Sequence, residues 1–313
     1  MAEQTLNLQT KRYAVVSGAN KGIGFEICKQ LASRGIHVIL TSRDTKRGIE
    51  AKEKLERHHG VSNNVVFHQL DVVDPVSIAA LVDFVETNYG KLDILVNNAG
   101  VGGIGIDGDS LIISQLVEGD IASVFSHGEP EAVELKNGKF IESFGDAKHC
   151  IQTNYYGPKR VTEALIPLLQ LSHSPRIVNV SSIMGNLRLL PNEWAKGILS
   201  NAETLTEEKI DQVIQEFLKS FEEGSLETNR WPTQLAAYKI SKASLSAYTR
   251  IMAKKFPTFC INCACPGFVR TDMTCNQGPL SVEEGAEVMV NLALLADGGP
   301  SGSFFYRNEA SFF

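Results

Sequence analysis

Residues 13–31, YAVVSGANKGIGFEICKQL, combine a short apolar run, a glycine-rich turn and an amphipathic segment. The run at 13–16 has the composition of a buried strand, and apolar side chains recur at helical spacing from Phe25 to Leu31. The glycines of the turn are Gly18, Gly22 and Gly24. Such a turn lets the backbone approach a pyrophosphate, and the following helix offers free N–H groups and the positive end of its dipole. The stretch predicts the first βαβ unit of a dinucleotide-binding fold, with a plain strand-to-helix turn as the alternative.

The composition excludes several classes of partner. The chain has 313 residues, is 43% hydrophobic and carries a formal net charge of −6, with a pI of about 5.7. This acidic balance offers no basic surface to nucleic acid or to an anionic membrane. Its apolar runs are too short to cross a bilayer, and its first residues are polar, without the apolar core of a signal peptide. We expect a soluble cytoplasmic protein that binds neither nucleic acid nor membranes.

Six cysteines in a chain of this length do not form the framework of a disulfide-rich protein. Cys263 and Cys265 have the spacing of a ligand pair, but no second pair stands near them at zinc spacing. We therefore expect reduced cysteines in and around a buried strand, and no metal site.

Strand and helix patterns alternate along much of the chain. Apolar runs at 37–42, 64–69, 92–96 and 176–180 are separated by amphipathic or charged helical segments. Nearly continuous apolar strands that alternate with helices predict a parallel sheet covered on both faces. Right-handed crossovers make such a sheet doubly wound, with the ligand at the carboxyl ends of the strands. No linker is visible, so we expect one Rossmann-like α/β domain of about seven strands over residues 1–313.

Two stretches are longer than this fold requires. Residues 101–145 are rich in glycine and acidic residues, and residues 183–234 contain the segment LTEEKIDQVIQEFLKSF. This segment has an apolar stripe at helical spacing and Thr206 as a candidate N-cap. Because both stretches follow a strand's carboxyl end, we predict helical insertions that roof a pocket. Surface helices without such a role are the alternative.

Charges after the second predicted strand bear on which dinucleotide is bound. An acidic residue at this place would hold a ribose 2′-hydroxyl and favour NAD. Here Arg43 ends the strand, Arg47 follows one helical turn later, and Lys21 lies in the glycine loop. Arginine binds phosphate through a planar fork of donors, so this cluster favours the 2′-phosphate of NADP. Asp44 could serve NAD, but we expect it to cap the next helix. Solvated surface charges are a further alternative.

Tyr238 and Lys242 lie four residues apart in AYKISK, so on a helix they share one face. A nearby ammonium favours the phenolate and lowers the pKa of a tyrosine. The pair is therefore a candidate for acid/base chemistry near neutral pH, although the same spacing also occurs by chance on exposed helices.

Together these motifs resemble the short-chain dehydrogenase/reductase family. The matching positions are residues 17–24 (SGANKGIG), 70–72 (LDV), 97–100 (NNAG), Asn154, Ser181 with Ser182, Tyr238 with Lys242, and 266–271 (PGFVRT). Ser17 stands where the family usually has threonine and keeps the hydroxyl. Longer phrases such as GKLDILVNNAGV and TNYYGPKR resemble a plant branch that includes menthone (neomenthol), salutaridine and isopiperitenone reductases.

The resemblance implies a role for four residues. Tyr238 would donate a proton to a carbonyl oxygen, and Lys242 would lower the pKa of that tyrosine and hold the nicotinamide ribose. Ser182 would hydrogen-bond the substrate oxygen as charge develops on it, and Asn154 would hold a water that links Lys242 to solvent. The implied cofactor-binding residues are Gly18, Asn20, Lys21, Gly22, Ile23, Gly24, Arg43, Arg47, Asp71, Val72, Asn98, Ala99, Gly100, Tyr238, Lys242, Pro266, Gly267, Val269 and Thr271.

The resemblance therefore predicts NADPH-dependent reduction of a hydrophobic cyclic ketone, with a menthone-type monoterpenoid favoured. Tyr238 supports ketone reduction, because isopiperitenone reductase, which reduces a carbon–carbon double bond, has glutamate at this position. The alternatives are a bulkier alkaloid or terpenoid ketone and an NADP(H)-sensing or scaffolding protein without turnover.

The candidate substrate pocket is apolar, which suits a compact, water-poor molecule. Beside Ser182 and Tyr238 its residues are Ile104, Ile106, Met184, Trp194, Leu235, Phe268 and Met273. The second long stretch would cover the helix through which many family members oligomerise, so we predict a monomer.

Overall fold

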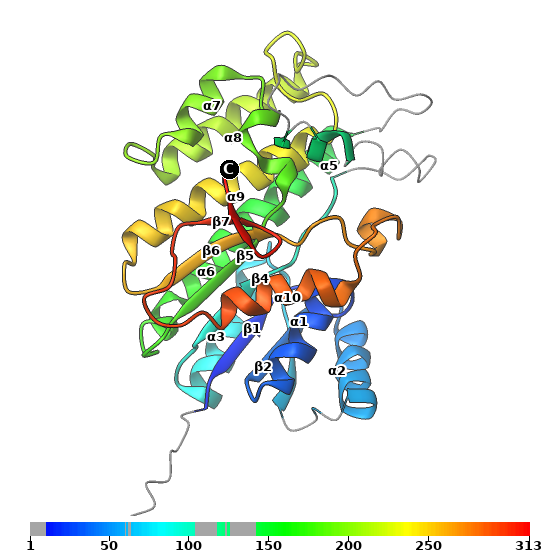
Figure 1. Ribbon diagram of the computed structural model, residues 1–313, viewed down its shortest axis with the longest axis vertical. Helices are drawn as coiled ribbons and strands as arrows, with labels where there is room; N and C mark the ends of the chain where they lie inside the picture. The colour runs from blue at the N-terminus through cyan, green and yellow to red at the C-terminus, as the bar shows by residue number, and fades with distance from the viewer. Residues whose placement is uncertain (1–10, 60, 62–63, 104–117, 123, 126–141) are drawn as a thin grey trace, which may run out of the picture.

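A single eight-stranded sheet organises the part of the chain that the structure describes, with strand order β3-β2-β1-β4-β5-β6-β7-β8 (Figure 1). This computed structural model describes residues 11–59, 61, 64–103, 118–122, 124–125 and 142–313. The strands are β1 (Tyr13–Val16), β2 (His37–Ser42), β3 (Val65–Gln69), β4 (Ile94–Asn97), β5 (Arg176–Val180), β6 (Cys260–Cys265), β7 (Phe304–Tyr306) and β8 (Glu309–Ser311). The helices are α1 (Gly22–Ser33), α2 (Thr45–His59), α3 (Pro75–Tyr89), α5 (Phe144–Ile151), α6 (Gly157–Leu169), α7 (Glu193–Ser200), α8 (Glu207–Glu222), α9 (Ala236–Lys255) and α10 (Val282–Ala293).

The pairing of the strands confirms the doubly wound parallel sheet. The first seven strands are parallel, as the alternation of strands and helices predicts. The eighth, β8, is antiparallel to β7 and adds an edge strand beyond the seven that were expected. It follows β7 after only two residues, and a turn that short can join only antiparallel strands.

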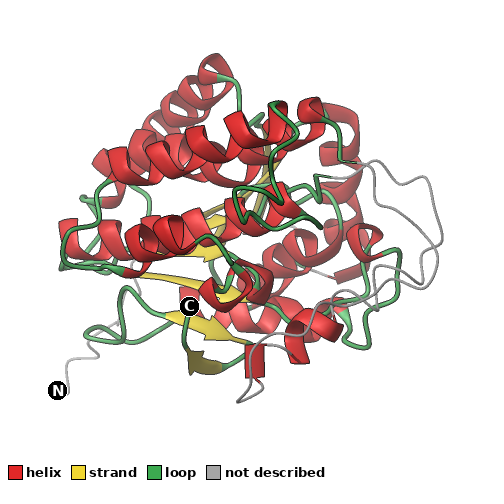
Figure 2. Cartoon of the chain, turned by 90° about the horizontal axis from the view of Figure 1, so that it is seen from above, coloured by secondary structure: helices red, strands yellow, loops and turns green. Residues whose placement is uncertain are grey.

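The core lies in two layers because successive strand residues point to opposite faces of the sheet. On one face Ala14 and Val16 pack with buried side chains of α1, α2 and α10. On the other face Val15 packs with buried side chains of α3, α6, α8 and α9. Each fully buried leucine or isoleucine in such a layer stabilises the fold by about 1.5–3 kcal/mol. Figure 2 shows the strands enclosed between helices.

The order of the strands reverses at β1, which pairs with β2 on one side and with β4 on the other. In a doubly wound sheet the crevice at such a switch point is where ligands bind, beyond the carboxyl ends of the strands. The segments that follow β1, β4, β5 and β6 therefore meet at this end of the sheet.

The helix predicted in the second long stretch forms as α8, with Thr206 accepting a hydrogen bond from Lys209 N at 3.4 Å. Its buried face includes Ile210, Val213 and Phe217 and joins the core on the α9 side. The first long stretch lies largely outside the described residues. Within the described ranges no helix combines the length and the apolar composition that a membrane crossing requires.

Candidate active site

The turn after β1 has a conformation that requires glycine. Gly18 has φ +63°, and a Cβ there would lie 2.8 Å from Ala99 Cα. A Cβ on Gly24 would lie 2.4 Å from Asn98 Nδ2, which donates to the carbonyl oxygens of Ser17 and Gly18 at 2.9 and 3.1 Å. The turn and the segment after β4 are therefore packed too closely for any larger residue.

The hydroxyl of Ser17, which stands where the family usually has threonine, bonds to the segment that follows β4. Its Oγ accepts hydrogen bonds from Asn98 N and Ala99 N, both at 3.0 Å. The substitution therefore leaves the connection between β1 and β4 intact.

The N-terminus of α1 is suited to a phosphate group. No side chain caps its first turn, and that turn contains no acidic residue. Gly22 at its start has φ +57°, and a Cβ there would meet only the Thr271 methyl group, at 3.7 Å. The glycine backbone thus borders open space beside free N–H donors, which is the arrangement a pyrophosphate requires.

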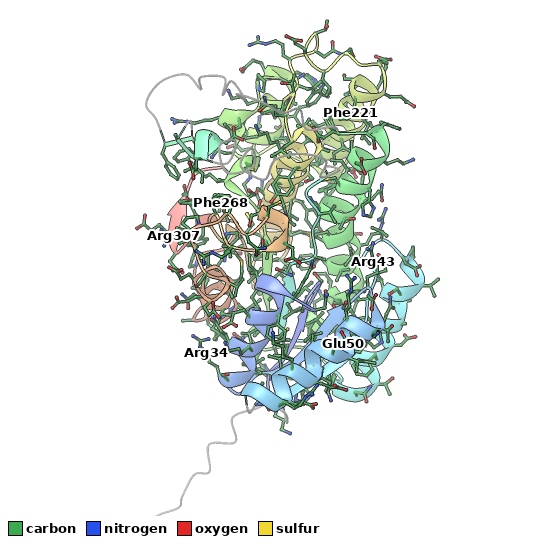
Figure 3. The ribbon with its side chains drawn as sticks, turned by 90° about the vertical axis from the view of Figure 1, so that its right-hand side faces the viewer. Arg34, Arg43, Glu50, Phe221, Phe268 and Arg307 are labelled. Carbon is green, nitrogen blue, oxygen red and sulfur yellow. The ribbon has the colours of Figure 1, made fainter. Side chains whose placement is uncertain are left out.

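Asp44 caps α2, as predicted, because its Oδ1 accepts a hydrogen bond from Arg47 N at 2.9 Å. Arg43 directly follows β2, and both Arg43 and Arg47 are exposed. Figure 3 shows Arg43 beside the pale blue N-terminal helices, on the opposite side of the view from Phe268. Lys21 in the glycine loop forms an exposed ion pair of 2.5 Å with Asp272, and its contact with a cofactor phosphate stays a prediction.

The three polar residues of the predicted chemistry lie together. Lys242 Nζ is 5.6 Å from the centroid of the Tyr238 ring and donates to Val180 O at 2.8 Å. Ser182 and Tyr238 line the same pocket. Ser181 points the other way, since its Oγ bonds Lys242 O at 3.2 Å and Ser246 Oγ at 2.8 Å. The structure therefore separates the two serines, with only Ser182 on the pocket side.

Burial dominates the protonation of this group. Burial raises the pKa of the Tyr238 phenol above its ordinary value, and the nearby Ser182 hydroxyl acts in the opposite direction. Burial also lowers the pKa of the Lys242 ammonium to about 8. Lys242 donates to a backbone carbonyl rather than to Tyr238, so in this structure the expected lowering of the tyrosine pKa is outweighed by desolvation.

Asn154 lies in a π-helical turn, Gln152–Tyr156, between α5 and α6, and is fully buried. Turns of this kind occur frequently at functional sites. Its Oδ1 accepts from Val101 N at 2.8 Å, and its Nδ2 donates to Val101 O at 2.9 Å and to Ser241 Oγ at 3.1 Å. The side-chain amide therefore ties the segment after β4 to α9, while the water that was expected here stays a prediction.

Other predicted cofactor residues lie at the same end of the sheet, and some of their side chains are buried. Asp71 Oδ1 accepts from Val73 N at 3.1 Å, and Val72 is buried. Val269 is also buried, and a Cβ on Gly285 of α10 would lie 2.6 Å from its Cγ2, so its side chain packs on that helix. Thr271 begins a short turn next to Gly22.

A pocket of about 90 Å³ opens beside the hydroxyl groups of Ser182 and Tyr238. Its lining residues are Gly102, Ile121, Ser182, Met184, Leu235, Tyr238, Gly267, Phe268, Met273 and Thr274. Every predicted substrate residue within the described ranges is among them except Trp194, and that prediction was wrong. Trp194 lies in the first turn of α7, with 44% of its surface exposed. Ile104 and Ile106 lie outside the described residues.

Sequence reasoning missed the acidic contacts at the start of α9. Leu235 precedes this helix with φ +49° and provides no side-chain cap, so Glu142 caps it instead. The Glu142 carboxylate accepts from Ala236 N at 2.9 Å and Ala237 N at 3.2 Å. Asp120 forms a largely buried ion pair of 2.9 Å with Lys239, next to the pocket residue Ile121. The sequence feature that could have indicated these contacts is Leu235, because a leucine cannot cap the helix that follows it.

A doubly wound sheet with a glycine turn at its switch point and a largely buried serine–tyrosine–lysine group beside it is typical of an oxidoreductase that uses NAD(P). A family model described as short chain dehydrogenase matches residues 12–127. The chain is 56% identical to (−)-isopiperitenone reductase of Mentha piperita, over 96% of this chain and 98% of that protein.

Two solved structures are similar over almost the whole chain. The menthone neomenthol reductase from Mentha piperita is 55% identical with a TM-score of 0.86, over 96% of this chain and 100% of that one. Salutaridine reductase from Papaver somniferum is 51% identical with a TM-score of 0.83, over 95% and 99%. The chain belongs to the short-chain dehydrogenase/reductase family.

Gly24→Ala tests the close packing of the cofactor turn. We expect it to lower the free energy of unfolding by about 1–3 kcal/mol, as overpacking does, and to weaken binding of the dinucleotide, because Asn98 must move. The matched control is Gly197→Ala in α7, where an added Cβ meets nothing within 4 Å. That variant should gain about 0.5–1 kcal/mol. Urea unfolding and titrations with NADH and NADPH measure both quantities, and an equal response of the two variants would contradict this account of the turn.

Proposed function

We propose that this protein reduces a hydrophobic cyclic ketone to a secondary alcohol with NADPH, and that Tyr238 donates the proton. The observation that carries the proposal is the placement of the Ser182 and Tyr238 hydroxyl groups on an otherwise mostly apolar pocket, with the Lys242 ammonium behind them. A menthone-type monoterpenoid ketone is the favoured substrate.

Ser182, Tyr238 and Lys242 each have a separate role in the proposed reaction. The bound cofactor supplies the hydride. Ser182 donates a hydrogen bond to the carbonyl oxygen, which stabilises the charge that develops there. Tyr238, kept protonated by its buried surroundings, gives that oxygen its proton. Lys242 supplies a positive charge beside the phenol, which stabilises the phenolate that remains.

The choice of NADPH over NADH rests on Arg43 and Asp44. The Asp44 carboxylate has a structural role as the cap of α2, because its Oδ1 accepts a hydrogen bond from Arg47 N at 2.9 Å. Arg43 is exposed at the end of β2, next to the glycine turn in the sheet, where its guanidinium can hold a 2′-phosphate.

The substrate class rests on the pocket and on the relatives. The side chains of Ile121, Met184, Leu235, Phe268 and Met273 give the pocket an apolar wall, which suits a compact molecule with one polar group. The similarity to menthone neomenthol reductase supports a cyclic monoterpenoid ketone. The similarity to salutaridine reductase supports a bulkier alkaloid or terpenoid ketone as the second candidate.

Tyr238→Phe tests the proton donor. Loss of a general acid costs about 100- to 10,000-fold in rate, so we expect a fall of this size in ketone reduction, with the affinity for NADPH unchanged. The assay is NADPH oxidation over a panel of cyclic ketones that includes menthone, with products separated by chiral chromatography.

Tyr248→Phe is the matched control, because it removes a hydroxyl from the same helix. That hydroxyl is buried and has no hydrogen-bond partner in the described part of the chain, so activity should be retained. Full turnover by Tyr238→Phe would exclude the proposed role, and a product that keeps its carbonyl would point to double-bond reduction. NADPH binding without turnover of any ketone would instead favour an NADP(H) sensor or scaffold.

Arg43→Ala tests the cofactor preference. Hydrogen bonds to charged groups contribute about 1.5–3 kcal/mol, so loss of the guanidinium should weaken NADPH binding by about tenfold to a hundredfold and leave NADH binding unchanged. Arg57→Ala is the control. Arg57 is an arginine of α2, the helix that follows Arg43, and it pairs with Glu53 on the surface of that helix. Fluorescence titration with both cofactors gives the affinities. An equal loss of affinity for NADH would show that Arg43 does not bind the 2′-phosphate.

We also propose a monomer. Helix α8 lies against α9 and is tied to α6 by the Lys159–Glu207 ion pair, so this outer face is already covered. Light scattering at micromolar concentration should give a mass near 34.2 kDa. A dimer or tetramer would contradict the proposal.

A further inference from the structure

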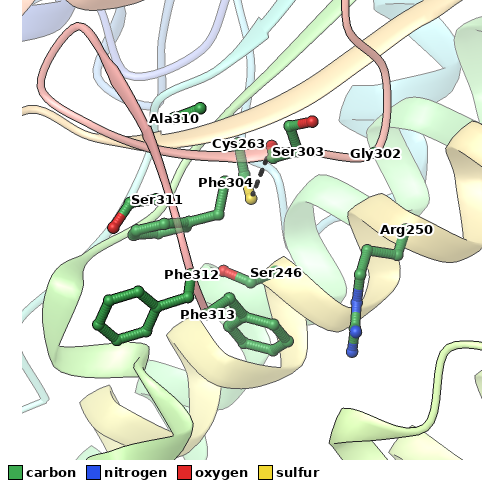
Figure 4. A pocket seen from close by; sticks show the side chains of 10 residues that line it. All are labelled: Ser246, Arg250, Cys263, Gly302, Ser303, Phe304, Ala310, Ser311, Phe312 and Phe313. Carbon is green, nitrogen blue, oxygen red and sulfur yellow. Dashed lines mark hydrogen bonds between the residues drawn. The ribbon is translucent and has the colours of Figure 1, made fainter.

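A second and larger cavity, of about 480 Å³, lies between α9, the strands β6 and β7, and the residues that end the chain. Its lining residues are Ser246, Arg250, Cys263, Gly302, Ser303, Phe304, Ala310, Ser311, Phe312 and Phe313 (Figure 4). None of them lines the pocket beside Tyr238. The volume falls within the range of small-molecule sites, about 300–1,000 Å³.

Aromatic rings form a prepared apolar wall in this cavity. Phe304 belongs to β7 and pairs with Ser311 of β8, so both strands hold the wall in register. The Phe312 carbonyl oxygen accepts from Asn186 Nδ2 at 3.0 Å, and the Arg188 guanidinium lies 5.0 Å from the Phe312 ring centroid. These contacts fix the wall in the absence of a ligand.

Arg250 supplies the only charged side chain among the lining residues. Its guanidinium lies 4.8 Å from the Phe313 ring centroid and donates to the carbonyl oxygens of Leu199 and Ser200. No carboxylate pairs with it among the described residues, and its buried Nε–H has no acceptor there. Burial lowers the pKa of Arg250, which reflects the cost of a partly desolvated cation without a counter-charge.

Figure 4 shows the Phe313 ring between the Phe312 ring and the Arg250 side chain. We propose that this cavity is a second ligand site that binds a small organic anion, a carboxylate or sulfonate carried on an apolar ring body. The charge pairs with the Arg250 guanidinium, which presents planar donors to such a group. The ring body lies against the phenylalanine wall. The site is separate from the pocket beside Tyr238, so the inference does not depend on the proposed reaction.

The test compares two fluorescent probes that differ only in charge. 8-Anilinonaphthalene-1-sulfonate has a sulfonate on an apolar body, and N-phenyl-1-naphthylamine is the same body without it. Both are titrated into the wild-type protein with saturating NADP⁺ and menthone, which occupy the cofactor crevice and the pocket beside Tyr238. We expect saturable binding of one equivalent of the sulfonate, about tenfold or more tighter than the neutral probe.

Variants then locate the bound sulfonate. Arg250→Met should weaken its binding by about tenfold to a hundredfold, whereas Arg250→Lys, which keeps a cation, should lose less. Arg34→Met removes an exposed arginine of α1's C-terminal cap, labelled in Figure 3, and should bind as the wild type does. Circular dichroism checks that Arg250→Met keeps its fold, because Arg250 also holds the end of α7.

Three results would overturn the proposal. They are equal affinity of the two probes for the wild-type protein, unchanged sulfonate binding in Arg250→Met, and sulfonate binding that is seen only when NADP⁺ and menthone are left out of the titration. The first needs no variant, so the proposal can fail even where Arg250→Met does not fold.

Discussion

The attachment of α9 to the carboxyl end of β5 is the constraint on which the rest of the site depends. Lys242 donates from the helix to Val180 O at 2.8 Å, and Ser181 at the strand end bonds back to Lys242 O at 3.2 Å. Further along, Asn179 Nδ2 donates to Thr249 Oγ1 at 2.9 Å. Because an unpaired buried polar group costs free energy, these bonds determine both the rotation of α9 and its position along the strand.

This attachment explains why Tyr238 and Ser182 meet. Two adjacent serines point to opposite sides where β5 ends, one into α9 and one into the pocket, so the helix is positioned by one and faces the other. The same burial that makes the position unique also withdraws water from the tyrosine and the lysine, which raises the pKa of the first and lowers that of the second. Burial at this junction thus determines both where Tyr238 and Lys242 lie and which way their pKa values shift.

Local patterns predicted a large part of this molecule because they depend on neighbouring residues alone. The strand–turn–helix at 13–31, the cap of α2 by Asp44 and the cap of α8 by Thr206 all appear as expected. The alternation of strands and helices predicted a sheet of about seven strands, but β7 and β8 are each three residues long and neither was located in the sequence. The residues that line the pocket beside Tyr238 are mostly apolar, whereas Trp194 lies exposed on α7 and is not among them.

The sequence by itself determined the class of fold, the nucleotide turn and the spacing of Tyr238 and Lys242, since each follows from backbone geometry over a few residues. Only the tertiary structure decided which side chains complete the site. Glu142 caps a helix that begins 94 positions later, and Lys21 pairs with Asp272, which lies 251 positions further along the chain. The cavity at Arg250 joins α9 to strands near the end of the chain. Such contacts depend on the path of all the residues between them, and no local pattern records that path.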